Sequence, residues 1–153
     1  MTLDDLEQVV RLERICFPDP WSEYSFRHEL TDAGDAGFPR VIELDGRVVG
    51  YLIGWYILDE AHLANLALDP EVRGLGLAAS LLEEFLREGA SRGCTLALLE
   101  VRVTNHPAIR LYERFGFRGV SVRKNYYAAL REDALVMMRP LASETEETDG
   151  FGL

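Results

Sequence analysis

Residues 62–101 carry the pattern that most limits how this chain can fold. The apolar run HLANLAL predicts a strand, a glycine-rich loop follows it, and residues 76–91 place apolar side chains at helical spacing. TLALLEV is apolar on both sides and predicts a second, central strand that is buried on both faces. A helix that joins two strands of one sheet returns by a right-handed crossover, so the two strands lie parallel. We therefore expect an α/β domain (an α+β mixed sheet), with the loop after the first strand available to a ligand.

The elements on either side of this unit complete the expected architecture, a central mixed β-sheet with helices on both faces. Helices are predicted for residues 3–15 and, after Ser22 as the capping residue, for a short second segment. Asp45 and Gly46 are typical of a hairpin turn, and Pro107 is typical of a helix start. The remaining strands are predicted at RVIEL, RVVGYLIGWYIL, FRGVSVRKNYY and ALVMMRPL.

Length, charge and cysteine content narrow the class of protein. The 153 residues predict one domain, 1–141, and an acidic tail, 142–153, too poor in apolar residues to fold. The net charge is −10, and about −6 without the tail, which argues against nucleic-acid binding. An acidic surface would attract a basic partner, and solubility alone is an equally good explanation of the charge. The sequence lacks a signal-peptide pattern and a membrane-length apolar run, so we expect a soluble cytoplasmic protein without membrane contact. Isolated cysteines and scattered histidines suggest no disulfide and no metal site.

The glycine loop DPEVRGLGLAASLL has more than one interpretation. Small residues let the backbone approach a ligand, and the amides at the following helix start favour a phosphate. The loop also satisfies the dinucleotide fingerprint GxGxxA, with Glu100 as the ribose-binding acid. In that fingerprint, however, the first glycine closes the strand directly, whereas DPEVR intervenes here, and little chain remains after Glu100 to complete such a fold. Turn geometry alone is a third explanation of the glycines.

The pattern Arg-x-x-Gly-x-Ala at Arg73–Ala78 resembles the pyrophosphate loop of the GNAT acetyltransferases. LANLALDPEVRGLGLAASLL and LEVRVTNHPAIRLYERFGF cover both halves of that family's core, and PWS, NYY and EDA extend the resemblance to ribosomal-protein-alanine N-acetyltransferases of the RimI type, up to Leu141. The resemblance implies a GNAT acyl-CoA N-acyltransferase fold, acetyl-CoA as cosubstrate, and acetylation of an N-terminal alanine on a basic ribosomal protein. One departure is that only Met1 and Thr2 precede the first helix, where the family normally has a strand.

Glu100 and Tyr112 are the candidate catalytic residues. Glu100 ends an otherwise apolar strand, and its carboxylate can take the proton of an attacking amine, directly or through a water. The Tyr112 phenol, with an ordinary pKa of about 10, can protonate a leaving thiolate of about 8.5. The alternatives are a solvated acid paired with Arg102 and an aromatic that only packs. The resemblance assigns the general base to Glu100 and the general acid to Tyr112.

The resemblance also implies the binding residues. The backbone of Leu66, Ala67 and Leu68 pairs with pantetheine and supplies the oxyanion donor, and Asn105 bonds pantetheine or caps its helix. The residues expected to bind the pyrophosphate are Arg73, Gly74, Leu75, Gly76, Leu77, Ala78 and Ala79, and those expected to contact the peptide are Trp21, Ser22, Tyr126 and Tyr127. For the aromatic residues among the peptide contacts, packing in the core or on the surface is the alternative role.

Two other functions stay open at this point. One is a GNAT acetyltransferase that modifies lysine side chains or other protein N-termini, and the other is a CoA-binding partner without turnover. An α-amine, with a pKa of about 8, is neutral far more often at pH 7 than a lysine of about 10.4, which favours an N-terminus as acceptor. The oligomeric state is not predicted.

Overall fold

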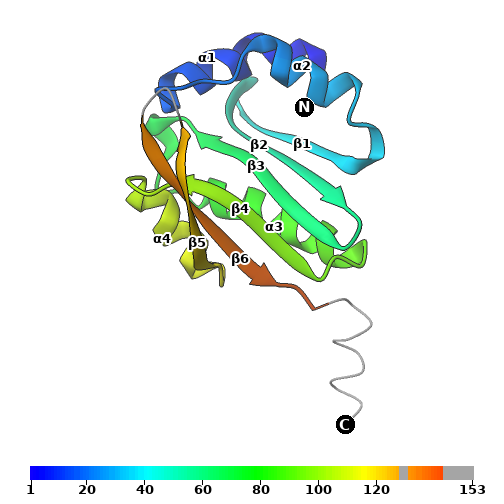
Figure 1. Cartoon of the computed structure of the whole chain (residues 1–153). Coiled ribbons are helices and arrows are strands. Elements are labelled where there is room, and N and C mark those ends of the chain that lie inside the picture. Colours follow the sequence, from blue (N-terminus) through cyan, green and yellow to red (C-terminus); the bar gives the residue numbers. More distant parts are fainter. Residues whose placement is uncertain (128–130, 143–153) are drawn as a thin grey trace. The chain divides into compact units, whose positions relative to one another are not determined.

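A computed structural model describes residues 1–127 and 131–142, so nearly all of the predicted acidic tail lies outside the described residues. The helices are α1 (Leu6–Cys16), α2 (Glu23–Thr31), α3 (Leu77–Ser91) and α4 (His106–Arg114). The strands are β1 (Gly37–Leu44), β2 (Arg47–Ile57), β3 (Glu60–Leu68), β4 (Leu96–Arg102), β5 (Arg118–Tyr127) and β6 (Glu132–Pro140). They form one six-stranded sheet in the order β1-β2-β3-β4-β6-β5, which confirms the predicted mixed sheet (Figure 1).

The chain divides into two compact units, and β2, β3 and α3 contribute residues to both. The first unit comprises Met1–Trp55 and Ala64–Phe85, and the second comprises Tyr56–Leu63 and the residues from Leu86 on. Across the described ranges, no helix combines the length and the apolar character needed to cross a membrane.

Helices cover both faces of β2 within the first unit. Tyr51 and Ile53 pack in one core cluster with apolar residues of α1 and α2, whereas Gly54 lies against the Phe85 ring of α3. Phe38 of β1 contacts the same ring, with the centroids 5.7 Å apart. Gly37, Phe38 and Pro39 also pair with β2, so β1 begins at Gly37, three residues before the predicted RVIEL segment.

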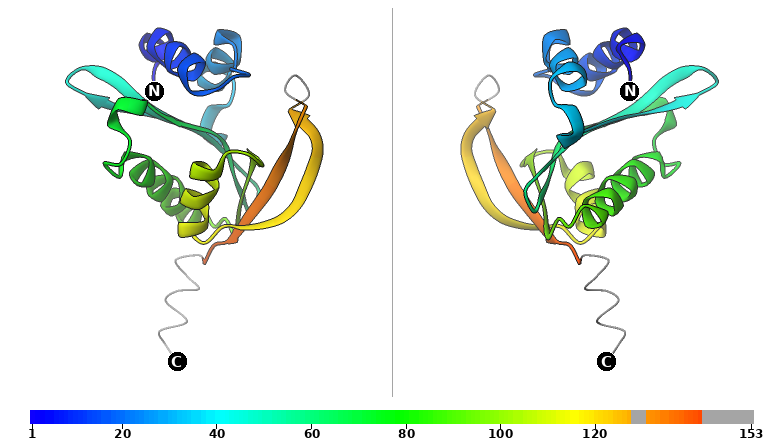
Figure 2. Two further views of the ribbon diagram at one scale, coloured as in Figure 1. Left: turned by 90° about the vertical axis from the view of Figure 1, so that its left-hand side faces the viewer. Right: turned by 90° about the vertical axis from the view of Figure 1, so that its right-hand side faces the viewer.

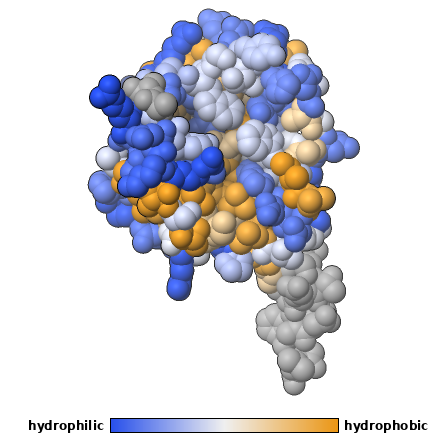
Figure 3. All heavy atoms as spheres, viewed as in Figure 1, coloured by the Kyte–Doolittle hydropathy of each residue, from blue (hydrophilic) through white to orange (hydrophobic). Residues whose placement is uncertain are grey.

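Local capping sets the ends of α1 and α2. A 3₁₀ turn, Leu3–Asp5, opens the first helix, and the Asp5 carboxylate accepts the Thr2 backbone N–H at 2.7 Å. The α1 helix ends before Pro18, and Ser22 caps α2 as predicted, because its Oγ accepts the Ser25 backbone N–H at 3.2 Å. The outward surface of the two helices is largely hydrophilic, which matches their amphipathic patterns (Figure 3).

The second unit is built around β4. Its parallel ladder with β3 pairs Glu60–Leu63 with Leu96–Leu99, as the crossover predicts. In the described residues this ladder ends at Leu63 and Leu99, although β3 continues to Leu68 and β4 to Arg102. Burial alternates along β4, so only one face of the strand is fully buried, and the prediction of a strand buried on both sides was wrong.

The β5–β6 hairpin bends strongly beside β4. The register between β5 and β6 shifts between Gly119 and Ser121 and again between Arg123 and Tyr127. Extra residues of this kind bend a strand and increase its twist. Figure 2 shows the resulting curvature of the hairpin, whose β6 strand is the antiparallel partner of β4.

Gly54→Ala should destabilise the first unit. A Cβ at this position would lie 2.3 Å from Cε2 of Phe85, so the packed ring must move. We expect the free energy of unfolding to fall by about 1–3 kcal/mol, measured by urea denaturation. The control is the same substitution in a Phe85→Leu background, where the smaller side chain should make the alanine much less costly. An equal loss in both backgrounds would show that the ring is not the cause.

Candidate active site

The first unit contains the end of β3 and the loop that follows it. Ala67 and Leu68 are buried, and the Leu68 carbonyl accepts hydrogen bonds from Cys16 Sγ and from Arg73 Nε, each at 3.4 Å. The Asp69 backbone N–H donates to the Val49 carbonyl at 2.7 Å. The loop therefore leaves β3 from a fixed point, and Arg73 points its guanidinium back to the strand end.

The two glycines of the loop are required by its backbone conformation. Gly74 and Gly76 have φ angles of 85° and 78°, in the left-handed region where other residues are strained, and a Cβ at either would meet nothing within 4 Å. The backbone amides of Leu77–Ala79, in the first turn of α3, have no hydrogen-bond partner within the helix, as in the first turn of any α-helix. Left-handed glycines before a helix start suit the binding of a phosphate group.

The predicted peptide-contact residues Trp21 and Ser22 lie between α1 and α2. Trp21 is half-buried, with its ring centroid 5.3 Å from that of Phe26. Its backbone N–H donates to Glu13 Oε2 at 2.8 Å, and Glu13 also receives the Tyr51 hydroxyl and, at 2.8 Å, Asn65 Nδ2. Glu13 was not among the predicted site residues. The available signal was a carboxylate on the apolar face of an amphipathic helix.

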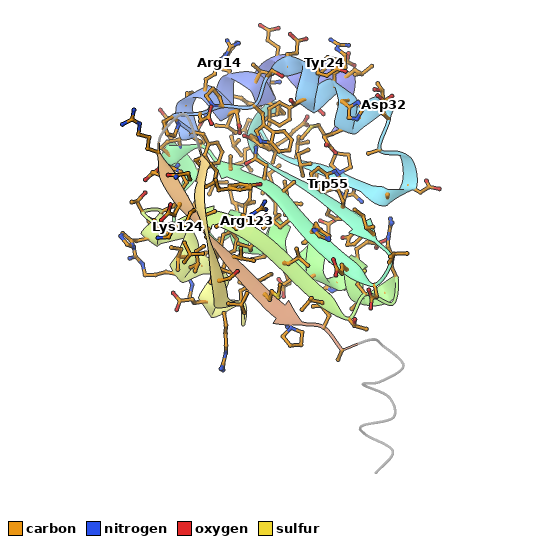
Figure 4. All side chains as sticks on the ribbon, viewed as in Figure 1. Arg14, Tyr24, Asp32, Trp55, Arg123 and Lys124 are labelled. Atoms are coloured by element: carbon orange, nitrogen blue, oxygen red, sulfur yellow. The ribbon has the colours of Figure 1, made fainter. Side chains whose placement is uncertain are left out.

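The second unit contains Glu100 at the carboxyl end of β4. Its side chain is 27% exposed and forms an ion pair with Arg123 of β5, with 3.2 Å between Oε1 and Nη1. Arg102, considered as its partner from the sequence, instead lies 3.5 Å from Glu132. Arg123 and Lys124 leave β5 in different directions, and the Arg123 guanidinium also lies 4.5 Å from the centre of the Tyr126 ring (Figure 4).

Tyr112 lies on α4 and is buried. Burial, and secondarily the charge of Tyr127, raises the pKa of the Tyr112 phenol far above its usual value. The phenol therefore keeps its proton throughout the neutral and mildly alkaline range. Its ring makes an edge contact with Phe117, with 6.0 Å between centroids. Packing is thus one role of Tyr112, and a retained proton is compatible with a second role as an acid.

Asn105 caps the α4 helix, as one of its two predicted roles requires. Its Oδ1 accepts the Ala108 backbone N–H at 3.3 Å, and Pro107 occupies the first turn. Gly116, with a φ of 87°, follows the end of the helix. The cap uses the side-chain oxygen, so the amide NH₂ is the group with which Asn105 can still donate to a ligand.

Tyr126 and Tyr127 lie at the end of β5, with their rings 5.0 Å apart in an edge arrangement. Burial, followed by the charges of Tyr126 and Glu100, raises the pKa of Tyr127 to about 12. Asn125 has a left-handed φ of 51°, and its backbone N–H donates to Asp133 at 2.8 Å. The NYY and EDA segments are therefore neighbours in space, and this position of Asp133 was not predicted.

The second unit thus brings Glu100, Tyr112 and Tyr127 into one electrostatic neighbourhood, with Tyr127 influenced by Glu100 and influencing Tyr112. The first unit brings the strand end, the glycine loop and the Trp21 segment onto one compact body. A carboxylate and a phenol are groups that can take part in general acid–base chemistry. A strand end followed by a glycine loop and a helix start is an arrangement that suits an extended, phosphate-bearing ligand.

Known proteins resemble the chain over most of its length. The model of the acetyltransferase (GNAT) family matches residues 6–117. A candidate ribosomal protein bS18-alanine N-acetyltransferase of Bacillus subtilis (strain 168) is 40% identical over 137 residues, 90% of each chain. The ribosomal protein bS18-alanine N-acetyltransferase of Escherichia coli (strain K12) is 36% identical over 140 residues, 90% of this chain and 93% of the relative. The crystal structure of the Escherichia coli ribosomal-protein-S18-alanine N-acetyltransferase superposes with a TM-score of 0.83 at 35% identity, covering 93% of this chain and 91% of that one.

Proposed function

The chain belongs to the GNAT acetyltransferase family and is an acetyl-CoA-dependent N-acetyltransferase, and we propose that its acceptor is the α-amine of an N-terminal alanine on a ribosomal protein. The observation that carries this proposal is the likeness to relatives named for that reaction, 36–40% identical over nine-tenths of the chain. The net charge of −10 suits a basic protein as partner.

Acetyl-CoA fits the residues of the first unit. The left-handed glycines of the loop bring backbone close to a ligand without a Cβ in the way, and the α3 amides at Leu77–Ala79 favour the diphosphate. Leu66–Leu68 lie beyond the described ladder between β3 and β4, so their backbone is the segment proposed to bond pantetheine. Asn105, a residue of the second unit, is proposed to add a donor from its amide NH₂. When bound, the cosubstrate supplies an activated acetyl thioester.

Glu100 is proposed as the general base. The amine nitrogen attacks the thioester carbon, the carbon–sulfur bond breaks, and the proton lost by the amine passes to the Glu100 carboxylate, directly or through water. With 27% of its side chain exposed, Glu100 is open enough for this transfer. The ion pair joins Oε1 to Arg123 Nη1 at 3.2 Å, and a carboxylate has about four acceptor positions, so the ion pair leaves room for the proton.

Tyr112 is proposed as the general acid that protonates the leaving CoA thiolate. Its phenol is protonated at neutral pH, which is the state that an acid needs, and the pKa raised by burial makes it a weaker donor than a free phenol. Direct transfer is favoured over an acetyl-cysteine intermediate, because burial raises the pKa of both Cys16 and Cys94. A thiol must lose its proton to act as a nucleophile.

The acceptor can be tested with peptides and acetyl-CoA. Peptides that begin with Ala, Ser or Met and continue with basic residues are compared with an N-terminally blocked peptide that contains an internal lysine. We expect mass spectrometry to find one acetyl group on the α-amine of the Ala peptide and none on the blocked peptide. Acetylation of the blocked peptide alone would replace this proposal with a lysine acetyltransferase, and CoA binding without any product would replace it with a binding partner.

Glu100→Gln should lower activity in a pH-dependent manner. The loss of the base should cost roughly 10²-fold in kcat/KM at pH 7. Above about pH 8 the deficit should shrink, since an α-amine with a pKa of about 8 then loses its proton unaided. The measurement is the pH profile of initial rates for the wild type and the variant.

The matched control for this profile is Glu132→Gln, which removes a carboxylate of the same unit that pairs with Arg102. Its profile should keep the shape of the wild type, whatever its absolute rate. A Glu100→Gln deficit that is the same at every pH would remove Glu100 from the role of base.

Tyr112→Phe should lower kcat by roughly 10²-fold while leaving acetyl-CoA affinity nearly unchanged. The phenylalanine keeps the packing against Phe117 and removes only the hydroxyl. Calorimetry gives the affinity and single-turnover kinetics give the rate. Tyr56→Phe, the same change at a buried tyrosine outside the candidate site, is the control and should leave kcat near that of the wild type. Lost acetyl-CoA binding or lost folding in Tyr112→Phe would make its role structural.

A further inference from the structure

Glu13 is the only polar or charged residue that is buried in the described part of the chain, with 1% of its surface exposed. It lies on α1 between apolar neighbours such as Val9, Val10 and Leu12, where an apolar side chain would complete the helix face. A carboxylate is costly to bury unless hydrogen bonds replace its hydration. Its partners therefore show what it is there to hold.

The two carboxylate oxygens of Glu13 face different elements. Oε1 accepts the Tyr51 hydroxyl of β2 and, at 2.8 Å, the Nδ2 of Asn65 on β3. Oε2 accepts the backbone N–H of Trp21 at 2.8 Å. A carboxylate only accepts hydrogen bonds, so a single residue satisfies three donors from three segments of the first unit.

The segment around Trp21, whose backbone N–H donates to Glu13 Oε2, has few other hydrogen bonds within the described part of the chain that fix its position. Pro18 and Pro20 have no backbone N–H to donate, and residues 18–20 are exposed. Ordinary helix hydrogen bonds resume only at α2, after the Ser22 cap. Figure 1 shows this connection between α1 and α2. The Trp21 position is thus set by Glu13 at its backbone and by Phe26 at its ring.

We propose that Glu13 is a positioning residue for the acceptor peptide: its Oε2 fixes the Trp21 backbone, while its Oε1 ties that anchor to β2 and, through Asn65, to the residue before Leu66. This inference rests on the proposed function, in which Trp21 and Ser22 contact the peptide and Leu66–Leu68 contact the cosubstrate. Glu13 itself touches neither. It fixes the peptide-contacting segment at Trp21 to β3, the strand on which the proposed function places the acetyl group.

Three variants separate this role from simple stabilisation. Glu13→Leu removes all three acceptor contacts, Tyr51→Phe removes only a donor on the Oε1 side, and Glu13→Gln keeps one oxygen and turns the other into a donor. Two quantities are measured in each: the steady-state KM for the peptide at saturating acetyl-CoA, and the hydrogen-exchange rate of the Trp21 amide by NMR. Thermal denaturation gives the stability of each variant.

In Glu13→Leu we expect the peptide KM to rise about tenfold, the size of one lost hydrogen bond, with a much smaller change in kcat. The Trp21 amide should exchange faster, while amides within α3 stay protected. Tyr51→Phe should lose stability but keep both the peptide KM and the Trp21 exchange rate of the wild type. A role limited to stability would instead lower the active fraction, and hence kcat, in both variants at unchanged KM.

If Glu13→Leu does not fold, Glu13→Gln can still test the inference, because the same two quantities, the peptide KM and the exchange rate of the Trp21 amide, are measured in it. If the glutamine side chain of Glu13→Gln turns its oxygen toward Trp21, the exchange rate of the Trp21 amide and the peptide KM should both stay near those of the wild type. If it turns its NH₂ group toward Trp21, both quantities should rise together. A raised KM with a protected Trp21 amide, or a fast-exchanging amide with an unchanged KM, would overturn the proposal. A wild type that acetylates no N-terminal peptide would overturn the proposed function instead, and the exchange rates would still report whether Glu13 holds Trp21.

Discussion

The short parallel ladder between β3 and β4 is the constraint on which the rest of the site depends. Two parallel strands that paired along their whole length would use the backbone of both for the sheet. In the described ladder the pairs end at Leu63 and Leu99, and each strand continues beyond them. The proposed cosubstrate site uses the end of β3 and the loop that follows it, which is rich in the conformations that only glycine adopts easily.

Much of the fold followed from apolar spacing and caps. The parallel crossover, the Asp45–Gly46 turn and the Ser22 cap were predicted and are confirmed. The family and the GNAT fold were inferred from the residues of the loop and of the Glu100–Phe117 segment, and the comparisons confirm both. The roles of Glu100 and Tyr112 stay predictions. The prediction that β4 is buried on both faces was wrong, because four apolar residues in a row do not show which face of a strand is covered.

The pairings of the charged residues could not be predicted for a reason of topology. Arg123 reaches Glu100 because β6, the last strand in the chain, lies between β4 and β5 in the sheet. Sequence patterns give the strands but not this order. Glu13 differs, because its position on the apolar face of α1 was visible in the sequence. What the sequence did not show was that its three donors come from segments as distant as Trp21 and Asn65.

The surroundings of Glu100 and Tyr112 suit opposite directions of proton flow. Glu100, the proposed base, is partly exposed and pairs with a half-exposed arginine, so a proton that it took from an amine could pass on to solvent. Tyr112, the proposed acid, is buried, and burial raises the pKa of its phenol, so the phenol keeps its proton at neutral pH and is a weaker acid than a free tyrosine. In the proposed mechanism, the proton would therefore pass only to a strong base formed in contact with the phenol. The two proposed roles thus fall on groups with opposite surroundings, an exposed carboxylate and a buried phenol.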